Sequence, residues 1–145
     1  MNYQEGQQYP MIVHLYELLS HRLNVFTHPS ARETYNMMNF VLQGYFVFQP
    51  DIRYEINHPG ESAADCVIAA VQEVLKRGDI DSMRLGLLGH SWGAYQTAYI
   101  ISQTPMFAAA VAGAPLTNMV SMYNSIYWEN GRSNQEMFET GQARF

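Results

Sequence analysis

A serine lies at the centre of the motif Gly-His-Ser-Trp-Gly, residues 89–93, which has the pattern G-x-S-x-G. An apolar run, residues 84–88, precedes the motif, and a segment with helical character, residues 92–103, follows it. This pattern between a strand and a helix is typical of a nucleophile elbow, a tight turn that exposes the serine hydroxyl above the edge of a sheet. We therefore predict that Ser91 is a nucleophile and that the backbone N–H of Trp92 helps to bind an oxyanion.

The residues that should activate this serine are missing from the sequence. A serine hydroxyl is a weak nucleophile unless a base removes its proton. Where such an elbow occurs, the acid and the histidine of the triad follow the serine along the chain. After Ser91 the sequence contains neither histidine nor aspartate, and His90 is expected to point away from the hydroxyl. We therefore expect a truncated catalytic domain that is inactive by itself.

Four apolar runs alternate with helical segments and predict the elements around the serine. The strands are expected at residues 11–16, 45–49, 84–88 and 107–112. The helices are expected from a capping box at Ser30 to residue 42, from near Ser62 to residue 77, and over residues 92–103. This alternation predicts an α/β fold with a mainly parallel sheet and flanking helices. We expect residues 1–145 to form a single domain.

Composition excludes several classes of partner. The formal net charge is −5, charged residues make up 14%, and Lys76 is the only lysine, which argues against binding to nucleic acid. The sequence has no basic amphipathic stretch and no apolar run long enough to cross a membrane. Cys66 cannot form an internal disulfide, and no histidine or cysteine pair has the spacing of a zinc site. No metal or cofactor is implied, and the compartment stays open between cytoplasmic and periplasmic or secreted.

Several stretches resemble the peptidase domain of the prolyl oligopeptidase family, which includes dipeptidyl and acylaminoacyl peptidases. They are the strand and loop at residues 44–53, the approach to the elbow at 79–86, the elbow at 89–95, and the next strand at 107–115. The resemblance covers about residues 10–127 and implies part of an α/β-hydrolase fold. It also implies a serine peptidase that cleaves a peptide substrate through an acyl-enzyme on Ser91.

The same resemblance implies roles for four further residues. Tyr16, just after the first strand, falls where the family has a tyrosine hydroxyl as second oxyanion donor, although packing at the rim of the core is an alternative. Leu116, Tyr123 and Tyr127 would line an apolar pocket, suited to proline or alanine, for the residue before the scissile bond. The alternative for the two pocket tyrosines is ordinary packing at helical spacing.

Other interpretations of the chain remain open at this stage. An esterase or other acyl hydrolase would use the same elbow, and a non-catalytic module would keep the sheet only as an interaction surface. A partial sheet leaves an exposed edge, through which the chain could associate with itself. Asp51 and Arg53, after the second strand, either form a pair or fix a loop. His14 and Cys66 are expected to be packed rather than catalytic.

Overall fold

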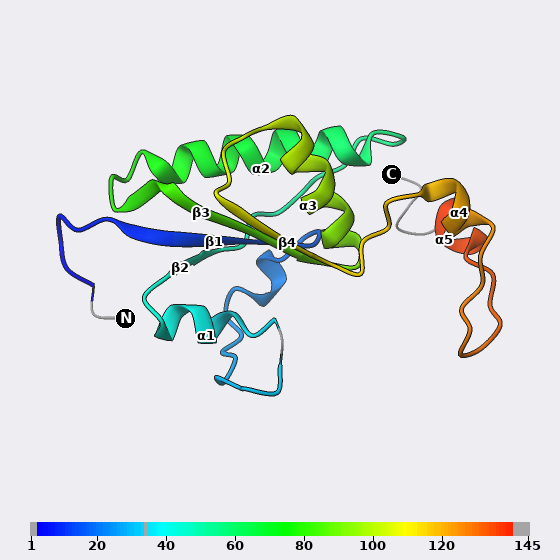
Figure 1. Ribbon diagram of the computed structural model, residues 1–145, viewed down its shortest axis with the longest axis horizontal. Coiled ribbons are helices and arrows are strands. Elements are labelled where there is room, and N and C mark those ends of the chain that lie inside the picture. The colour runs from blue at the N-terminus through cyan, green and yellow to red at the C-terminus, as the bar shows by residue number, and fades with distance from the viewer. Residues whose placement is uncertain (1–2, 34, 141–145) are drawn as a thin grey trace.

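A four-stranded sheet is the centre of the computed structural model, which describes residues 3–33 and 35–140 (Figure 1). The strand order is β2-β1-β3-β4, and every pairing between neighbouring strands of this sheet is parallel. The strands are β1 (Tyr9–Leu15), β2 (Phe46–Phe48), β3 (Ile80–His90) and β4 (Ala109–Gly113). The predicted α/β class with a mainly parallel sheet is therefore confirmed.

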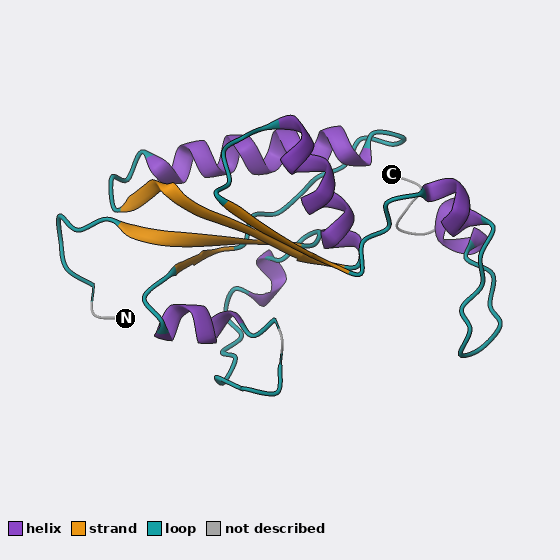
Figure 2. Ribbon diagram, in the orientation of Figure 1, coloured by secondary structure: helices purple, strands orange, loops and turns teal. Residues whose placement is uncertain are grey.

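Helices cover both faces of this sheet (Figure 2). The long helices α2 (Pro59–Leu75) and α3 (Trp92–Gln103) lie on one face, and α1 (Met37–Leu42) lies on the other. A short 3-10 helix, η1 (Ser20–Arg22), follows β1. Two further short helices, α4 (Met119–Tyr123) and α5 (Gln135–Glu139), lie beyond the carboxyl ends of the strands.

The hydrophobic core lies between the sheet and the two long helices. One buried cluster contains Val13 of β1, Leu87 of β3, and Val67 and Val71 of α2, each of them at most 1% exposed. Apolar residues at helical spacing on α2 form the face that packs on the sheet. Cys66, half-buried on the same helix, packs against this core, as the sequence predicted. This packing holds α2 against one face of the sheet.

The first helix begins later than the sequence predicted. Its first residue is Met37, and Asn36 occupies the N-cap position. The Ser30 hydroxyl accepts a hydrogen bond from the backbone N–H of Arg32 at 3.2 Å, which closes a local turn instead of a capping box. The Asn36 side-chain amide donates to the carbonyl oxygen of His28 and to the Glu33 carboxylate. The capping-box prediction was therefore wrong.

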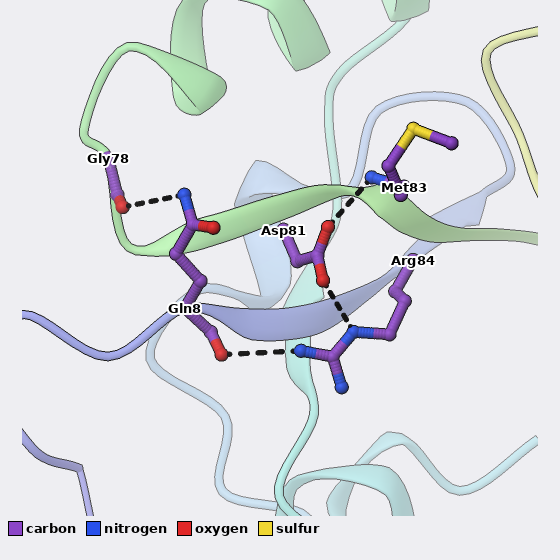
Figure 3. Close-up of polar contacts among 5 residues, drawn as sticks. All are labelled: Gln8, Gly78, Asp81, Met83 and Arg84. Carbon is purple, nitrogen blue, oxygen red and sulfur yellow. Dashed lines mark hydrogen bonds and ion pairs between the residues drawn. The ribbon is translucent and has the colours of Figure 1, made fainter.

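The amino-terminal ends of β1 and β3 contain an irregular register. Tyr9 pairs with Ile80, but Met11 already pairs with Leu85, so β3 bulges over the intervening residues. Figure 3 shows how this bulge is closed: Asp81 accepts from the backbone N–H of Met83 at 2.9 Å and from Nε of Arg84 at 2.6 Å. Arg84 also donates to the backbone carbonyl of Gln8, whose side chain donates to the carbonyl of Gly78.

Pro10 lies within β1 rather than before it, in contrast to the prediction. Proline cannot donate to a strand ladder, so it occurs in sheets mainly at edges and bulges. Pro10 lies at the register shift between β1 and β3, and the pairing of β1 with β2 starts only at Met11. The strand therefore tolerates it and extends from Tyr9.

The sheet edge at β4 is open to solvent. Residues Ala109, Ala110 and Val111 are exposed, in contrast to the buried alternate residues of β1.

None of the described helices is long and apolar enough to span a membrane.

Candidate active site

The backbone at Ser91 forms a strained turn between β3 and α3. Ser91 has φ 56° and ψ −117°, a left-handed conformation that residues with a side chain rarely adopt. Its N–H donates to the carbonyl of Gly113 at 2.9 Å, and its carbonyl accepts from the N–H groups of Ala94 at 3.0 Å and Tyr95 at 3.1 Å. These bonds tie the turn to the end of β4 and to the first turn of α3. This is the geometry of a nucleophile elbow.

The two glycines of the motif are required by close approaches. A Cβ atom at Gly89 would lie 2.0 Å from the carbonyl oxygen of Gly93. A Cβ atom at Gly93 would lie 2.3 Å from the carbonyl oxygen of Leu15 and 3.6 Å from Cα of Tyr16. The helix after the serine is therefore packed directly against the carboxyl end of β1, which places β1, the turn and α3 in one compact unit.

Trp92 opens the helix behind the serine. Its indole is fully buried and donates from Nε1 to the Tyr54 hydroxyl at 3.1 Å. Its backbone N–H belongs to the first turn of α3, where N–H groups have no intrahelical acceptor. Such a group can donate to a developing negative charge beside the helix end.

Tyr16 lies directly after β1, beside this first helical turn. Its side chain is 36% exposed, and its carbonyl oxygen accepts from the Tyr54 hydroxyl at 3.3 Å. The Tyr16 hydroxyl is not part of the pocket that Ser91 lines. The structure thus places the Tyr16 backbone next to the elbow, where open parallel sheets bind ligands.

Ser91 lines an open pocket of about 490 Å³ at the carboxyl end of β4. Leu116 and Tyr127, both predicted from the sequence, lie in its wall, together with Met122 of α4 and Met137 of α5. Polar side chains of Thr117, Asn118, Ser121 and Ser125 also line it. The two methionines were not identified from the sequence, because no local pattern shows that α4 and α5 approach the same pocket.

Tyr123, the third predicted pocket residue, does not line this pocket. Its hydroxyl donates to the Glu139 carboxylate at 3.1 Å, and this bond raises the pKa of Tyr123. Its ring packs edge-on against Phe138, with the ring centroids 5.6 Å apart. Tyr123 therefore joins α4 to α5, the two helices that supply Met122 and Met137.

The histidines near the sheet make other contacts. Nδ1 of His90 lies 3.1 Å from the Tyr35 hydroxyl, and the two rings pack together at 4.9 Å. Nδ1 of His14 lies 2.9 Å from the Gln49 amide, and burial, followed by the charge of Arg22, lowers the pKa of His14. No hydrogen bond joins a histidine to Ser91, and no cluster of metal-ligating side chains occurs, in residues 3–33 and 35–140.

Comparison with known proteins agrees with this geometry. The sequence pattern of the prolyl oligopeptidase family matches residues 33–143. The chain belongs to this family. The resemblance in the elbow and its flanking strands is thereby confirmed.

Similar curated sequences include a peptidase and an acylamino-acid-releasing enzyme. The chain is 35% identical over 80 residues to the uncharacterized peptidase YuxL of Bacillus subtilis, a match that covers 52% of this chain and 12% of that protein. It is 38% identical over 63 residues to the acylamino-acid-releasing enzyme of Arabidopsis thaliana, which covers 43% of this chain and 8% of that protein. The chain thus spans about an eighth or less of the length of these relatives.

Solved structures of acylaminoacyl peptidases share the fold. The acylaminoacyl peptidase of Pyrococcus horikoshii superposes with a TM-score of 0.64 at 19% identity, covering 84% of this chain and 21% of that one. An acylaminoacyl peptidase in complex with Z-Gly-Gly-Phe-chloromethyl ketone superposes with a TM-score of 0.65 at 19% identity and the same coverage. The predicted partial α/β-hydrolase fold is confirmed.

Proposed function

We propose that Ser91 is the nucleophile of a serine peptidase that forms an acyl-enzyme. The observation that supports this most directly is the left-handed backbone of Ser91, held beside an open pocket by the close contacts at Gly89 and Gly93. Strain of this kind persists only where the surrounding structure enforces it, and it is concentrated at functional sites. Membership in a family of peptidases makes peptide-bond hydrolysis the reaction that fits this serine.

In this proposal, Oγ of Ser91 attacks the carbonyl carbon of the scissile peptide bond while a base takes the hydroxyl proton. The carbonyl π electrons move to oxygen, and the oxyanion accepts hydrogen bonds from the Trp92 N–H and the Tyr16 hydroxyl. The tetrahedral intermediate collapses, the C–N bond breaks, and the proton passes to the leaving amine. Water then attacks the acyl-enzyme by the same route and releases the acid.

The base and its orienting acid come, in this proposal, from groups outside these 145 residues. Neither His90 nor His14 is hydrogen-bonded to Ser91, and each contacts another side chain. Without a base the hydroxyl stays weakly nucleophilic. We therefore expect residues 1–145 alone to be inactive.

The pocket beside Ser91 is the proposed site for the residue before the scissile bond. Leu116, Tyr127, Met122 and Met137 provide apolar surface there, which suits a small apolar side chain such as proline or alanine. Tyr123 joins α4 to α5, the two helices that supply Met122 and Met137.

Covalent labelling with a fluorophosphonate tests the nucleophile. We expect the longer protein that contains these residues to gain one adduct at Ser91 by intact mass and peptide mapping, and its Ser91→Ala variant to gain none. An adduct at another serine, or equal labelling of the variant, would contradict the assignment. Turnover of peptides rather than simple esters separates the peptidase from an esterase. No reaction at all in the longer protein would favour the non-catalytic module.

A further inference from the structure

Tyr54, in the segment between β2 and α2, contacts both sides of the elbow. Nε1 of Trp92 donates to the Tyr54 hydroxyl at 3.1 Å, and the side-chain amide of Gln96 donates to the same oxygen. The hydroxyl in turn donates to the carbonyl oxygen of Tyr16 at 3.3 Å. One donor and two acceptor positions are the full capacity of a hydroxyl. Tyr54 therefore joins α3 to the segment that follows β1.

The partners on α3 are deeply buried. The side chains of Trp92 and Gln96 are both 0% exposed. A buried N–H group without an acceptor destabilises the fold, so both groups favour a fixed position of the Tyr54 oxygen. A tyrosine hydroxyl is protonated at neutral pH, and burial raises the pKa of Tyr54 further, so this group remains a donor to Tyr16.

Neighbours of Tyr54 hold the same segment after β1. The N–H of Ile52 donates to the carbonyl of Glu17 at 3.0 Å. The Asp51 carboxylate accepts from the backbone N–H groups of Leu19 at 2.6 Å and Ser20 at 2.8 Å. Hydrogen bonds from Ser20 and Leu19 lower the pKa of Asp51. Asp51 therefore fixes a loop, one of the two alternatives from the sequence, and Tyr54 extends this attachment to α3.

We propose that Tyr54 is a positioning residue for the oxyanion site. Its hydroxyl fixes the distance between the Tyr16 segment and the first turn of α3, the two segments that supply the expected oxyanion donors. At Gly93 these segments are already in contact, since a Cβ there would lie 3.6 Å from Cα of Tyr16. This inference rests on the proposed function of Ser91. A displacement of about 1 Å in a catalytic group can lower a rate about 100-fold.

The test compares Tyr54→Phe with the wild type in the full-length protein. The variant keeps the ring and loses only the hydroxyl. We expect kcat per active site to fall by about 10- to 100-fold, with KM changed by less than about twofold, because the oxyanion forms only after substrate binds. Titration of Ser91 with a fluorophosphonate gives the concentration of active sites. Tyr45→Phe is the matched control, since its ring packs edge-on against Phe40 at 6.3 Å before the start of β2, and it should leave kcat unchanged.

A double-mutant cycle with Tyr16→Phe tests the route of the effect. If Tyr54 acts through Tyr16, its removal costs less in the Tyr16→Phe background than in the wild type. The proposal would be overturned if the fold-loss in kcat of the double variant equalled the product of the losses of the two single variants. A lower number of active sites with unchanged kcat per site would also overturn it, since that result indicates a purely structural residue.

A second variant covers the case in which the loss of the Tyr54 hydroxyl prevents folding. If Tyr54→Phe does not fold, the variant Tyr54→Phe with Gln96→Met removes the buried amide that lost its acceptor, and the same kinetics apply. Full activity of that double variant would overturn the proposal. Turnover by the wild type with an unaffected Tyr54→Phe would reject only the role of Tyr54. Absence of Ser91 labelling and turnover in the wild type would reject the proposed function and this inference with it.

Discussion

Ser91, the proposed nucleophile, has an unfavourable backbone conformation. Its φ of 56° and ψ of −117° suit glycine far better than serine or alanine. We predict that Ser91→Gly is about 1 kcal/mol more stable toward unfolding than Ser91→Ala. Both variants lack the hydroxyl, so the difference between their unfolding free energies in urea reports the backbone strain at this position. Equal stability would show that the turn is not strained.

Gly113 lies in a crowded position beside Tyr35 and His90. A Cβ there would lie 1.9 Å from the Tyr35 hydroxyl oxygen and 3.1 Å from Nδ1 of His90. We predict that Gly113→Ala lowers the free energy of unfolding by about 1–3 kcal/mol. Adding Tyr35→Phe removes the nearest atom and should restore part of this loss. Thermal unfolding of both variants and of Tyr35→Phe alone checks the prediction, which fails if the double variant is the least stable.

The site residues differ in how far sequence could predict them. The G-x-S-x-G motif is local, so Ser91 and the role of its glycines follow from a few adjacent residues. The contact of Tyr123 with Glu139 depends on how α5 docks on α4, and the link from Tyr54 to Tyr16 depends on how two loops meet. Neither has a local pattern, so neither could be predicted.

Among the helices and strands, periodicity predicted the regular parts and failed at their ends. The helix expected at residues 92–103 matches α3, because an elbow fixes its start and Pro105 follows its end. The start of α1 was wrong because Ser30 closes a local turn with Arg32. The extension of β1 past Pro10 was missed because it depends on a register shift with β3. Ends of elements are decided by tertiary contacts that periodicity does not contain.

Adjacent isoleucines on α3 test the packing of that helix on the sheet. Ile100 is 0% exposed and belongs to the core, whereas Ile101 is 47% exposed. We predict a loss of about 2–5 kcal/mol in unfolding free energy for Ile100→Ala, from lost burial and the cavity left behind. Ile101→Ala should cost less than half of that. Comparable losses in chemical denaturation would contradict the orientation of α3.

The junction between α2 and β3 should depend on pH. Nη2 and Nε of Arg77 donate to the Asp79 carboxylate at 3.1 and 3.3 Å, and these bonds lower the pKa of Asp79 below 3.8. A carboxylate with a lowered pKa in the folded state stabilises the fold at pH values above its pKa in the unfolded state. This stabilisation is lost as the pH falls through the pKa of the folded state. We predict that Asp79→Asn is less stable at pH 7 and loses less stability between pH 5 and 2.5. Urea midpoints check this, with exposed Glu129→Gln as the control.

In the complete fold of the described residues, β4 leaves a sheet edge accessible. Its exposed residues are small and apolar, and Val111 is 56% exposed. Natural edge strands are usually protected by charges, prolines or bulges. We propose that the 145-residue chain associates with itself through this edge and predict concentration-dependent dimers in sedimentation. Val111→Lys should shift the chain toward monomer. Val120 is also an exposed valine but lies outside the sheet, so Val120→Lys should not.

The contact between Leu15 and Gly93 has a consequence for the order of folding. Leu15 pairs with Gly89, and its carbonyl lies against position 93, although β2, α1 and α2 come between them in the sequence. Parallel pairings of this range form slowly, because the chain loses much entropy before the contact is made. The turn at Ser91 can be held in its strained shape only after β1 has docked. In a nascent chain the turn at Ser91 therefore takes its final shape only when the earliest strand has met one synthesised much later.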